Sequence, residues 1–262
     1  MELRKHPEDK LLYYDLEVAP RVTYSYGNSY EPTEVEMIED GYILAFAYKW
    51  DHEDEIKFVG MNQFAGKLET RKSALVAELW NLHNEADILV AHNGDRFDQK
   101  VSNTEFIRFG HTPPSTYHEV DTLKIARQKL LLRNNTLDEI ASFLGVGGKT
   151  GHSAKKLCTD ILKGIDRWQE MELYNKQDVQ VLIDVHERLR GWAKSYPNRR
   201  VSGFKCPVCL TGKITKNGYK NNKPHTAEHQ RWKCQSKKCG TEVLGVINPD
   251  FEKPEYKSKE HA

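Results

Sequence analysis

Two acidic residues interrupt an apolar segment near the start of the 262-residue chain. Residues 11–18 read LLYYDLEV, a composition that favours a buried β-strand, and they include Asp15 and Glu17. Residues two apart in a strand share one face, so both carboxylates should point the same way. Burying two ionised carboxylates together is costly unless a cation neutralises them. The pair is therefore a candidate metal site, although most pairs of this kind are solvated surface acids.

Two later segments carry further acids in defined local contexts. The sequence NGDRFD (93–98) directly follows the apolar run DILVA, which places Asp98 at the start of a helix and at the end of a strand. Binding sites on open α/β sheets lie at such strand ends, but Asp98 could also serve as a helix N-cap. In YNKQD (174–178), Tyr174 and Asp178 are four residues apart and share one face of a long helix. Taken singly, the simpler interpretation is favoured, in which Tyr174 packs in the core and Asp178 forms an ion pair.

The order of the three motifs is Asp-x-Glu on a first strand, Asn-x-x-x-Phe-Asp after a later strand, and Tyr-x-x-x-Asp on a late helix. This order resembles that of the DEDDy 3′→5′ exonucleases of the RNase H-like superfamily, best known as proofreading domains of family B DNA polymerases. The resemblance spans residues 8–193. A sister class has histidine five residues before the last aspartate, where this chain has Leu173, so the tyrosine class is favoured.

The resemblance implies a set of metal ligands. Asp15, Glu17, Asp98 and Asp178 would hold two Mg²⁺ or Mn²⁺ ions, with Asp15 shared between them. Two such ions can activate a water and stabilise the charges of phosphodiester hydrolysis. Tyr174 would orient the attacking water, because a tyrosine with an ordinary pKa of about 10 suits positioning better than general-base catalysis.

Other residues are candidates for contact with nucleic acid. By the resemblance, Asn93 and Phe97 match positions that contact the terminal nucleotides, although Phe97 is as easily a core residue. Tyr24, Tyr26 and Tyr30 could stack on bases, since aromatic side chains bind single strands without sequence preference. The simpler interpretation is that they are exposed tyrosines of a loop.

The pattern of elements predicts an α/β fold, an RNase H-like mixed sheet flanked by helices, over residues 1–193. Residues 21–40 are polar and contain glycine and proline, so we expect a long loop there. Three strands followed by alternating helices and strands indicate a mixed sheet with helices on its faces. The expected strands are 11–18, 41–50, 55–60, 87–91 and the start of 119–128; the expected helices are 72–84, 98–110, the rest of 119–128, 136–144, 153–164 and 166–192.

Four of the five cysteines lie close together in the C-terminal part of the sequence. They form the pairs Cys206-x2-Cys209 and Cys234-x4-Cys239, separated by 24 residues. Two such pairs on paired turns predict a Cys₄ zinc ribbon at 204–245, reached through a linker at 194–203 and followed by a charged tail at 246–262. His225 and His229 are alternative ligands. The zinc would be structural, because four protein ligands leave no open position; Cys158 is expected to be a plain buried residue.

The net charge of +1 hides an uneven distribution. Residues 194–245 hold 12 Lys and Arg against 2 Asp and Glu, a net +10, whereas residues 1–193 hold 24 against 32, a net −8. Basic residues interleaved with aromatics are typical of a surface that binds a nucleic-acid backbone, although a ribbon this small must be polar in any case. The candidate contacts in the ribbon are Lys216, Lys220, Arg231 and Trp232.

Composition limits the class of protein and its location. With 38% hydrophobic and 29% charged residues, the chain is expected to be globular, and no apolar run approaches the roughly 20 residues that span a bilayer. The N-terminal residues are polar, which favours an intracellular, cytoplasmic location. The combination with a zinc ribbon and no polymerase domain resembles stand-alone bacteriophage proteins, which would work in the host cytoplasm.

These features together predict a metal-dependent 3′→5′ exonuclease that hydrolyses single-stranded DNA to nucleoside monophosphates, with the ribbon assisting binding. Its partner is nucleic acid, single-stranded DNA being favoured and RNA being an alternative, and replication or repair proteins are further candidates. Three other functions stay open: an RNA-trimming exoribonuclease, an RNase H-like endonuclease, and a non-catalytic nucleic-acid-binding replication accessory module.

Overall fold

The computed structural model describes residues 9–26, 33–147, 153–193, 196–197, 206, 208–209, 213–221, 228–240 and 242–245. These residues fall into two compact units, one from residue 9 to residue 197 and one made of the described residues from 206 onward. The predicted tail at 246–262, Tyr30, and all of the predicted linker except residues 196–197 lie outside the described residues.

A five-stranded mixed sheet forms the centre of the first unit, in the order β5-β4-β1-β6-β7. The central strand β1 (Leu11–Val18) pairs antiparallel with β4 (Ile43–Trp50), which pairs antiparallel with β5 (Lys57–Gly60). On its other side, β1 runs parallel to β6 (Ile88–Ala91), and β6 runs parallel to β7 (His118–Asp121). The first three strands predicted at 11–18, 41–50 and 55–60 thus form an antiparallel meander, and the predicted mixed sheet is confirmed.

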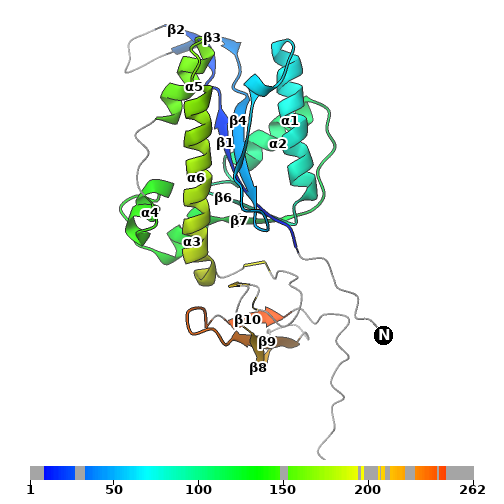
Figure 1. The fold of residues 1–262 in the computed structure, drawn as a ribbon, viewed down its shortest axis with the longest axis vertical. Coiled ribbons are helices and arrows are strands. Elements are labelled where there is room, and N and C mark those ends of the chain that lie inside the picture. Colours follow the sequence, from blue (N-terminus) through cyan, green and yellow to red (C-terminus); the bar gives the residue numbers. More distant parts are fainter. Residues whose placement is uncertain are drawn as a thin grey trace, which may run out of the picture. The chain divides into compact units, whose positions relative to one another are not determined.

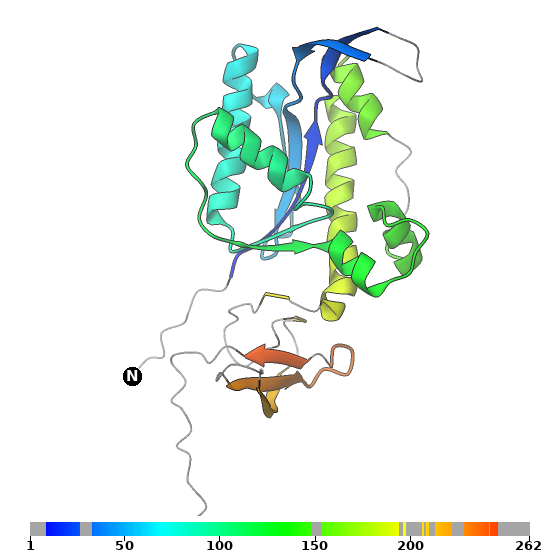
Figure 2. The same ribbon diagram turned by 180° about the vertical axis from the view of Figure 1, so that it is seen from behind.

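Helices cover both faces of this sheet. α1 (Leu68–Glu85) and α2 (Asp98–Arg108) lie on one face, and the long α6 (Trp168–Leu189) packs across β1, β4 and β5 on the other (Figures 1 and 2). α3 (Thr122–Lys129) and α4 (Leu137–Leu144) pack against α6. The mixed α/β fold with flanking helices is the architecture that the sequence predicts.

The connecting elements complete the unit. α5 (Ala154–Leu162) packs against both β1 and α6, and two short 3₁₀ helices lie at Met61–Gln63 and Arg190–Trp192. The predicted helix 166–192 is thus an α-helix that ends in a 3₁₀ turn. Among the helices of the described chain, none is both long and apolar enough to cross a membrane.

β1 contributes side chains to a core on each side of the sheet. Leu12, Tyr14 and Leu16 belong to the core that contains apolar residues of α1, and Leu11 and Tyr13 belong to the core that contains those of α6. Because side chains alternate along a strand, Asp15 and Glu17 lie on the α6 side. The packing of α6 against this strand therefore determines what the two acids face.

The prediction of a long loop at 21–40 is wrong. Residues 22–26 form β2 (Val22–Tyr26) and residues 33–39 form β3 (Thr33–Glu39), which pair antiparallel with each other. These two strands form a sheet of their own, and the described side chains of β2 are largely exposed. Residues 22–26 read VTYSY, a run that favours a strand, but the glycine, proline and polar residues around it favoured the prediction of a loop.

The second unit contains a three-stranded antiparallel sheet in the order β10-β9-β8. β8 spans Ile214–Asn221 and β9 spans Glu228–Cys234, both within the range 204–245 predicted for the ribbon. β10 (Glu242–Gly245) adds a third strand that the cysteine spacing did not specify.

Candidate active site and cysteine cluster

Three of the predicted acids meet on the α6 side of the central sheet. Carboxylate oxygens of Asp15, Glu17 and Asp178 all lie within 4.8 Å of one another. β1 supplies the first two and α6 supplies the third. The two-residue period of the strand sets the first pair, and helix packing brings the third acid to it.

Asp98 stands beside this group rather than within it. It is the first residue of α2, and its Oδ1 accepts a hydrogen bond of 3.3 Å from the backbone amide of Leu16. The pairing of β1 with β6 ends at Tyr13 and Val90, so β1 continues beyond the end of its neighbour. Asp98 thus contacts β1 between Asp15 and Glu17, and its charge raises the pKa of both.

All four acids bind protons more tightly than ordinary carboxyl groups. Burial, followed by the charges of Asp98 and Glu17, raises the pKa of Asp15 well above its usual range. Burial and the Asp178 charge raise the pKa of Glu17 to about 8. Burial is also the main cause that raises the pKa of Asp98 to about 7 and that of Asp178 to about 6. At neutral pH these four acids therefore lack a nearby positive charge that would stabilise their ionised forms.

The donor set suits a divalent cation. Between described residues, no ion pair joins any of the four acids to a lysine, arginine or histidine. Asp15 keeps a partly exposed edge although its neighbours in β1 are buried, so an ion can reach it. Carboxylate oxygens without a protein counter-charge are the ligands that Mg²⁺ and Mn²⁺ prefer.

Tyr174 lies one helical turn before Asp178 on α6. A hydrogen bond from its hydroxyl lowers the pKa of Asp178, against the effect of burial. Burial, followed by the charges of Asp178 and Glu17, raises the pKa of Tyr174 further above its ordinary value. Tyr174 therefore keeps its proton at neutral pH and acts as a hydrogen-bond donor, which agrees with a positioning role.

Two residues contact the acids in ways that the sequence analysis missed. The fully buried Asn175 donates from Nδ2 to Asp15 Oδ2 at 2.8 Å and to the Asp15 carbonyl at 3.3 Å. Its position next to Tyr174 and three residues before Asp178 was a signal that we did not use. The thiol of Cys158 is buried as predicted, but it lies 3.8 Å from Glu17 Oε2 and donates to it. No pattern in the sequence indicates that contact.

The residues predicted to contact nucleotides lie in the loop before α2 and on β2. Phe97 is 46% exposed, so the core alternative is wrong, and Asn93 has a left-handed backbone with φ of 65°. Tyr24 and Tyr26 are exposed on β2. Their contacts with nucleic acid remain predictions.

Comparison with known proteins identifies the family to which this chain belongs. A model of the RNase_H superfamily matches residues 31–190, more than half of the chain. The chain belongs to the RNase_H superfamily. The match contains Asp98, Tyr174 and Asp178, whereas Asp15 and Glu17 precede it. Proteins of this superfamily are typically nucleases, which supports nuclease activity in general.

Among solved structures, the chain is similar to a family B DNA polymerase from the hyperthermophilic archaeon Pyrobaculum calidifontis. The sequence identity is 16% and the TM-score is 0.47, over 71% of this chain and 25% of the polymerase chain. The chain therefore spans about a quarter of the length of that polymerase. A search of curated proteins found no match.

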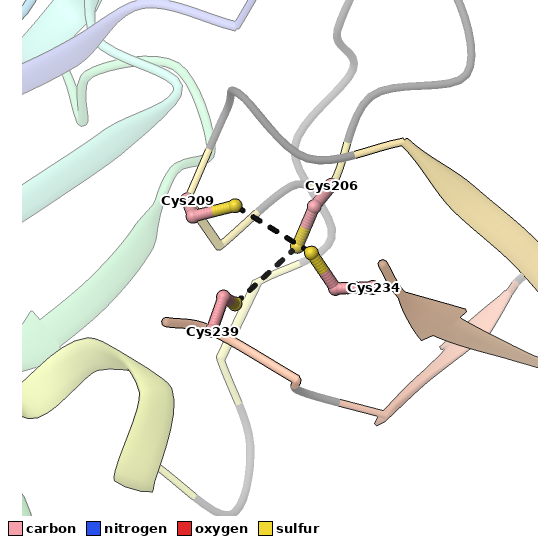
Figure 3. A group of neighbouring side chains, drawn as sticks. All are labelled: Cys206, Cys209, Cys234 and Cys239. Carbon is pink, nitrogen blue, oxygen red and sulfur yellow. Dashed lines mark hydrogen bonds between the residues drawn. The ribbon is translucent and has the colours of Figure 1, made fainter. Parts of the chain in front are cut away.

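The cysteine cluster lies outside the part that matches the RNase_H superfamily. The Sγ atoms of Cys206, Cys209, Cys234 and Cys239 all lie within 4.8 Å of one another, and none forms a disulfide (Figure 3). The sulfurs are 3.9 Å apart between Cys206 and Cys239 and 3.7 Å apart between Cys209 and Cys234. Tetrahedral zinc with bonds of about 2.3 Å separates its sulfurs by about 3.8 Å, so the cluster fits zinc.

Backbone amides support this arrangement of sulfurs. The amide of Val208 donates to Cys206 Sγ and the amide of Ser236 donates to Cys234 Sγ, both at 3.4 Å. Each bond reaches back two residues to the first cysteine of a pair and favours its thiolate. The side chain of His229, on β9, and all of His225 lie outside the described residues.

The predicted basic contacts lie on the two longer strands of this unit. Lys216 and Lys220 belong to β8, Arg231 and Trp232 belong to β9, and Lys216 pairs with Trp232 through the backbone. Their side chains lie outside the description, so their role in binding nucleic acid stays a prediction.

Proposed function

We propose that this chain is a metal-dependent 3′→5′ exonuclease of the DEDDy type that hydrolyses single-stranded DNA to nucleoside monophosphates. The observation that carries the proposal is the gathering of Asp15, Glu17 and Asp178 within 4.8 Å, with Asp98 hydrogen-bonded to the strand between the first two. Membership of the RNase_H superfamily supports it at the level of nuclease activity.

The four acids would hold two Mg²⁺ or Mn²⁺ ions. Such ions activate a water and neutralise charge on the phosphate and on the leaving 3′-oxygen. Asn175 fixes the orientation of Asp15 through its two hydrogen bonds, so this ligand needs little rearrangement when a cation binds. Tyr174 keeps its proton and would donate a hydrogen bond that orients the attacking water.

The second unit would supply the attraction for the substrate. Residues 1–193 carry a net −8 and would repel phosphates, whereas residues 194–245 carry a net +10. A structural zinc held by the four cysteines would keep the basic strands β8 and β9 folded. The ribbon would then bind the nucleic-acid backbone while the acids act on its 3′ end.

A single gel experiment tests the reaction, its polarity and its substrate. It uses 5′-labelled single-stranded DNA, single-stranded RNA and duplex DNA, each with Mg²⁺, Mn²⁺ or a chelator. We expect a ladder that shortens single-stranded DNA from its 3′ end and that the chelator abolishes. The Asp15→Asn variant should bind single strands and leave them intact, because it lacks a ligand for the cations.

Other results would contradict parts of the proposal. Digestion of RNA alone would make the chain an RNA-trimming exonuclease. Cleavage of circular single strands would indicate an endonuclease, since a circle has no end. Binding without cleavage under all conditions would indicate an accessory module. Digestion at the wild-type rate by Asp15→Asn would overturn the assignment of the site.

A further inference from the structure

One carboxylate outside the acid site forms hydrogen bonds with two elements that lie next to that site. Asp121 is the last residue of β7, and its Oδ1 accepts hydrogen bonds from the amides of Leu123 at 2.9 Å and Lys124 at 3.4 Å. These two bonds cap the N-terminus of α3. The same oxygen also accepts the amide of Asn93 at 2.9 Å, in the loop that precedes α2. Asp121 therefore does more than an ordinary helix cap.

The amide of Asn93 begins the turn that leads to Asp98. Asn93 adopts φ of 65°, and its carbonyl accepts the amides of Arg96 at 3.2 Å and Phe97 at 3.1 Å. A left-handed conformation is uncommon for a residue with a side chain and persists only where its surroundings hold it. The next residue after this turn is Asp98. A contact that fixes Asn93 thus fixes the start of the segment that carries a predicted metal ligand.

The strand register explains why Asp121 can reach this amide. β6 and β7 run parallel with Ala91 opposite Asp121, so both strands end at the same edge of the sheet. The chain turns tightly after β6, because a Cβ added at Gly94 would lie 2.6 Å from the Cβ of Ala91. The loop 92–97 is therefore folded back beside the end of β7, where the carboxylate of Asp121 lies.

A second contact joins the same two elements. Lys124, in α3, forms an ion pair of 2.6 Å with Oδ2 of Asp95, in the loop. Oδ1 of Asp95 and Oδ2 of Asp121 are both buried without a hydrogen-bond partner among the described residues. Burial, and after it the nearby Asp95 carboxyl, raises the pKa of Asp121 to about 6. An asparagine at 121 could donate to Asp95 directly and still accept the three amides.

We propose that Asp121 is a positioning residue of the nuclease site, which holds the loop 92–97 so that Asp98 is presented beside Asp15 and Glu17. The proposal rests on the proposed function, because it assumes that Asp98 binds a cation there. Residues that orient metal ligands typically change metal affinity by about 10- to 100-fold when they are replaced.

Two substitutions separate this role from helix capping. Asp121→Ser keeps a good N-cap for α3, but its short side chain cannot also reach the amide of Asn93. Asp121→Asn keeps the acceptor for all three amides. Thr136→Ala is the matched control, since Thr136 caps α4 through the amide of Glu139 and its side chain forms no hydrogen bond with the loop 92–97 among the described residues.

The measurements are Mn²⁺ binding by calorimetry, the melting temperature, and kcat and KM on single-stranded DNA, all with the full chain. We expect Asp121→Ser to lose about 10- to 100-fold in Mn²⁺ affinity and in kcat, with a smaller change in KM. Asp121→Asn should restore both. Thr136→Ala should lower the melting temperature without either loss. Wild-type affinity and kcat in Asp121→Ser, or equal losses in Thr136→Ala, would overturn the proposal.

Hydrogen exchange of the wild-type chain provides a test that needs no variant. The amide of Asn93 should be protected to the same degree as that of Leu123, because both donate to the same oxygen, and an unprotected Asn93 amide would contradict the proposal. If the wild type digests no substrate, the proposed function fails. The Mn²⁺ titration and the exchange measurement would then still decide the role of Asp121.

Discussion

The acid site and the cysteine cluster both gather negatively charged ligands, but different forces bring the ligands together. Asp15, Glu17 and Asp178 come from β1 and α6, whose apolar side chains pack into the core of the first unit. In the described part of the second unit, the buried core residues are two of the cysteines themselves and Val208. The first site is built on a core, and the second has little core besides its ligands.

This difference predicts opposite relations between metal and fold. In the first unit, the packed core holds the acids together without a cation. The electrostatic cost of burying neighbouring carboxylates raises their pKa values. In the second unit, the bonds from sulfur to zinc would supply the stability that a small core cannot. The fold of the first unit would therefore position the acids for a cation, whereas in the second unit bound zinc would stabilise the fold.

Zinc removal gives the largest effect expected from this comparison. A strong zinc chelator, or the Cys209→Ser substitution, should abolish the hydrogen-exchange protection of β8, β9 and β10 and leave that of β1 and α6 unchanged. Binding of single-stranded DNA should then weaken and lose most of its dependence on salt. Added zinc should restore both in the chelated wild type. Protection of β9 that persists without zinc would show that this unit has a sufficient core of its own.

Substitution at Asp178 should separate stability from activity. Asp178→Asn should reduce kcat by about 10³-fold, since the loss of a metal ligand removes several kcal/mol of transition-state stabilisation. Without divalent metal at about pH 8, the same variant should melt at a higher temperature than the wild type, because it removes a buried charge from an acidic cluster. Asp184→Asn, on the same helix, should change neither. A lower melting temperature for Asp178→Asn would show that the charge of Asp178 does not destabilise the metal-free fold.

The dependence on pH gives a smaller effect. The raised pKa values of Glu17, Asp98 and Asp178, about 8, 7 and 6, mean that these groups favour the metal-free fold when protonated. This contribution is complete below their ordinary pKa of about 4 and is lost progressively as the pH rises from there to about 8. The melting temperature of the metal-free first unit should therefore fall over that range.

Metal binding should show the opposite trend with pH. Protons compete with Mn²⁺ for the same oxygens, so the affinity should fall by about 10²-fold from about pH 8.5 to about pH 6.5. Calorimetry at the two values measures this change. An affinity for Mn²⁺ that is equal at both values would contradict the raised pKa values.

Much of the fold follows from patterns that the sequence displays directly. The apolar run of β1 and the alternation of helices and strands predict most elements to within a few residues. The hairpin of β2 and β3 was predicted as a loop, although its strands pair with each other. The run VTYSY at 22–26 is rich in β-branched and aromatic residues and favours a strand, but the polar residues, glycine and proline around it outweighed that signal.

What the sequence alone determined are relations set by local backbone geometry. The two-residue period of a strand puts Asp15 and Glu17 on one face, the helical turn puts Tyr174 next to Asp178, and the cysteine spacing defines two pairs of ligands. Relations of this kind need no knowledge of distant contacts, because they depend on residues within one element.

What only the tertiary structure decided are contacts between elements. The packing of α6 on β1 brings Asp178 to the strand acids and places Asn175 against Asp15. The parallel ends of β6 and β7 bring Asp121 to the loop before Asp98. These contacts join residues that are between 28 positions (Asn93 and Asp121) and 163 positions (Asp15 and Asp178) apart. They depend on how whole helices and strands pack into the core, which short-range periodicity does not encode.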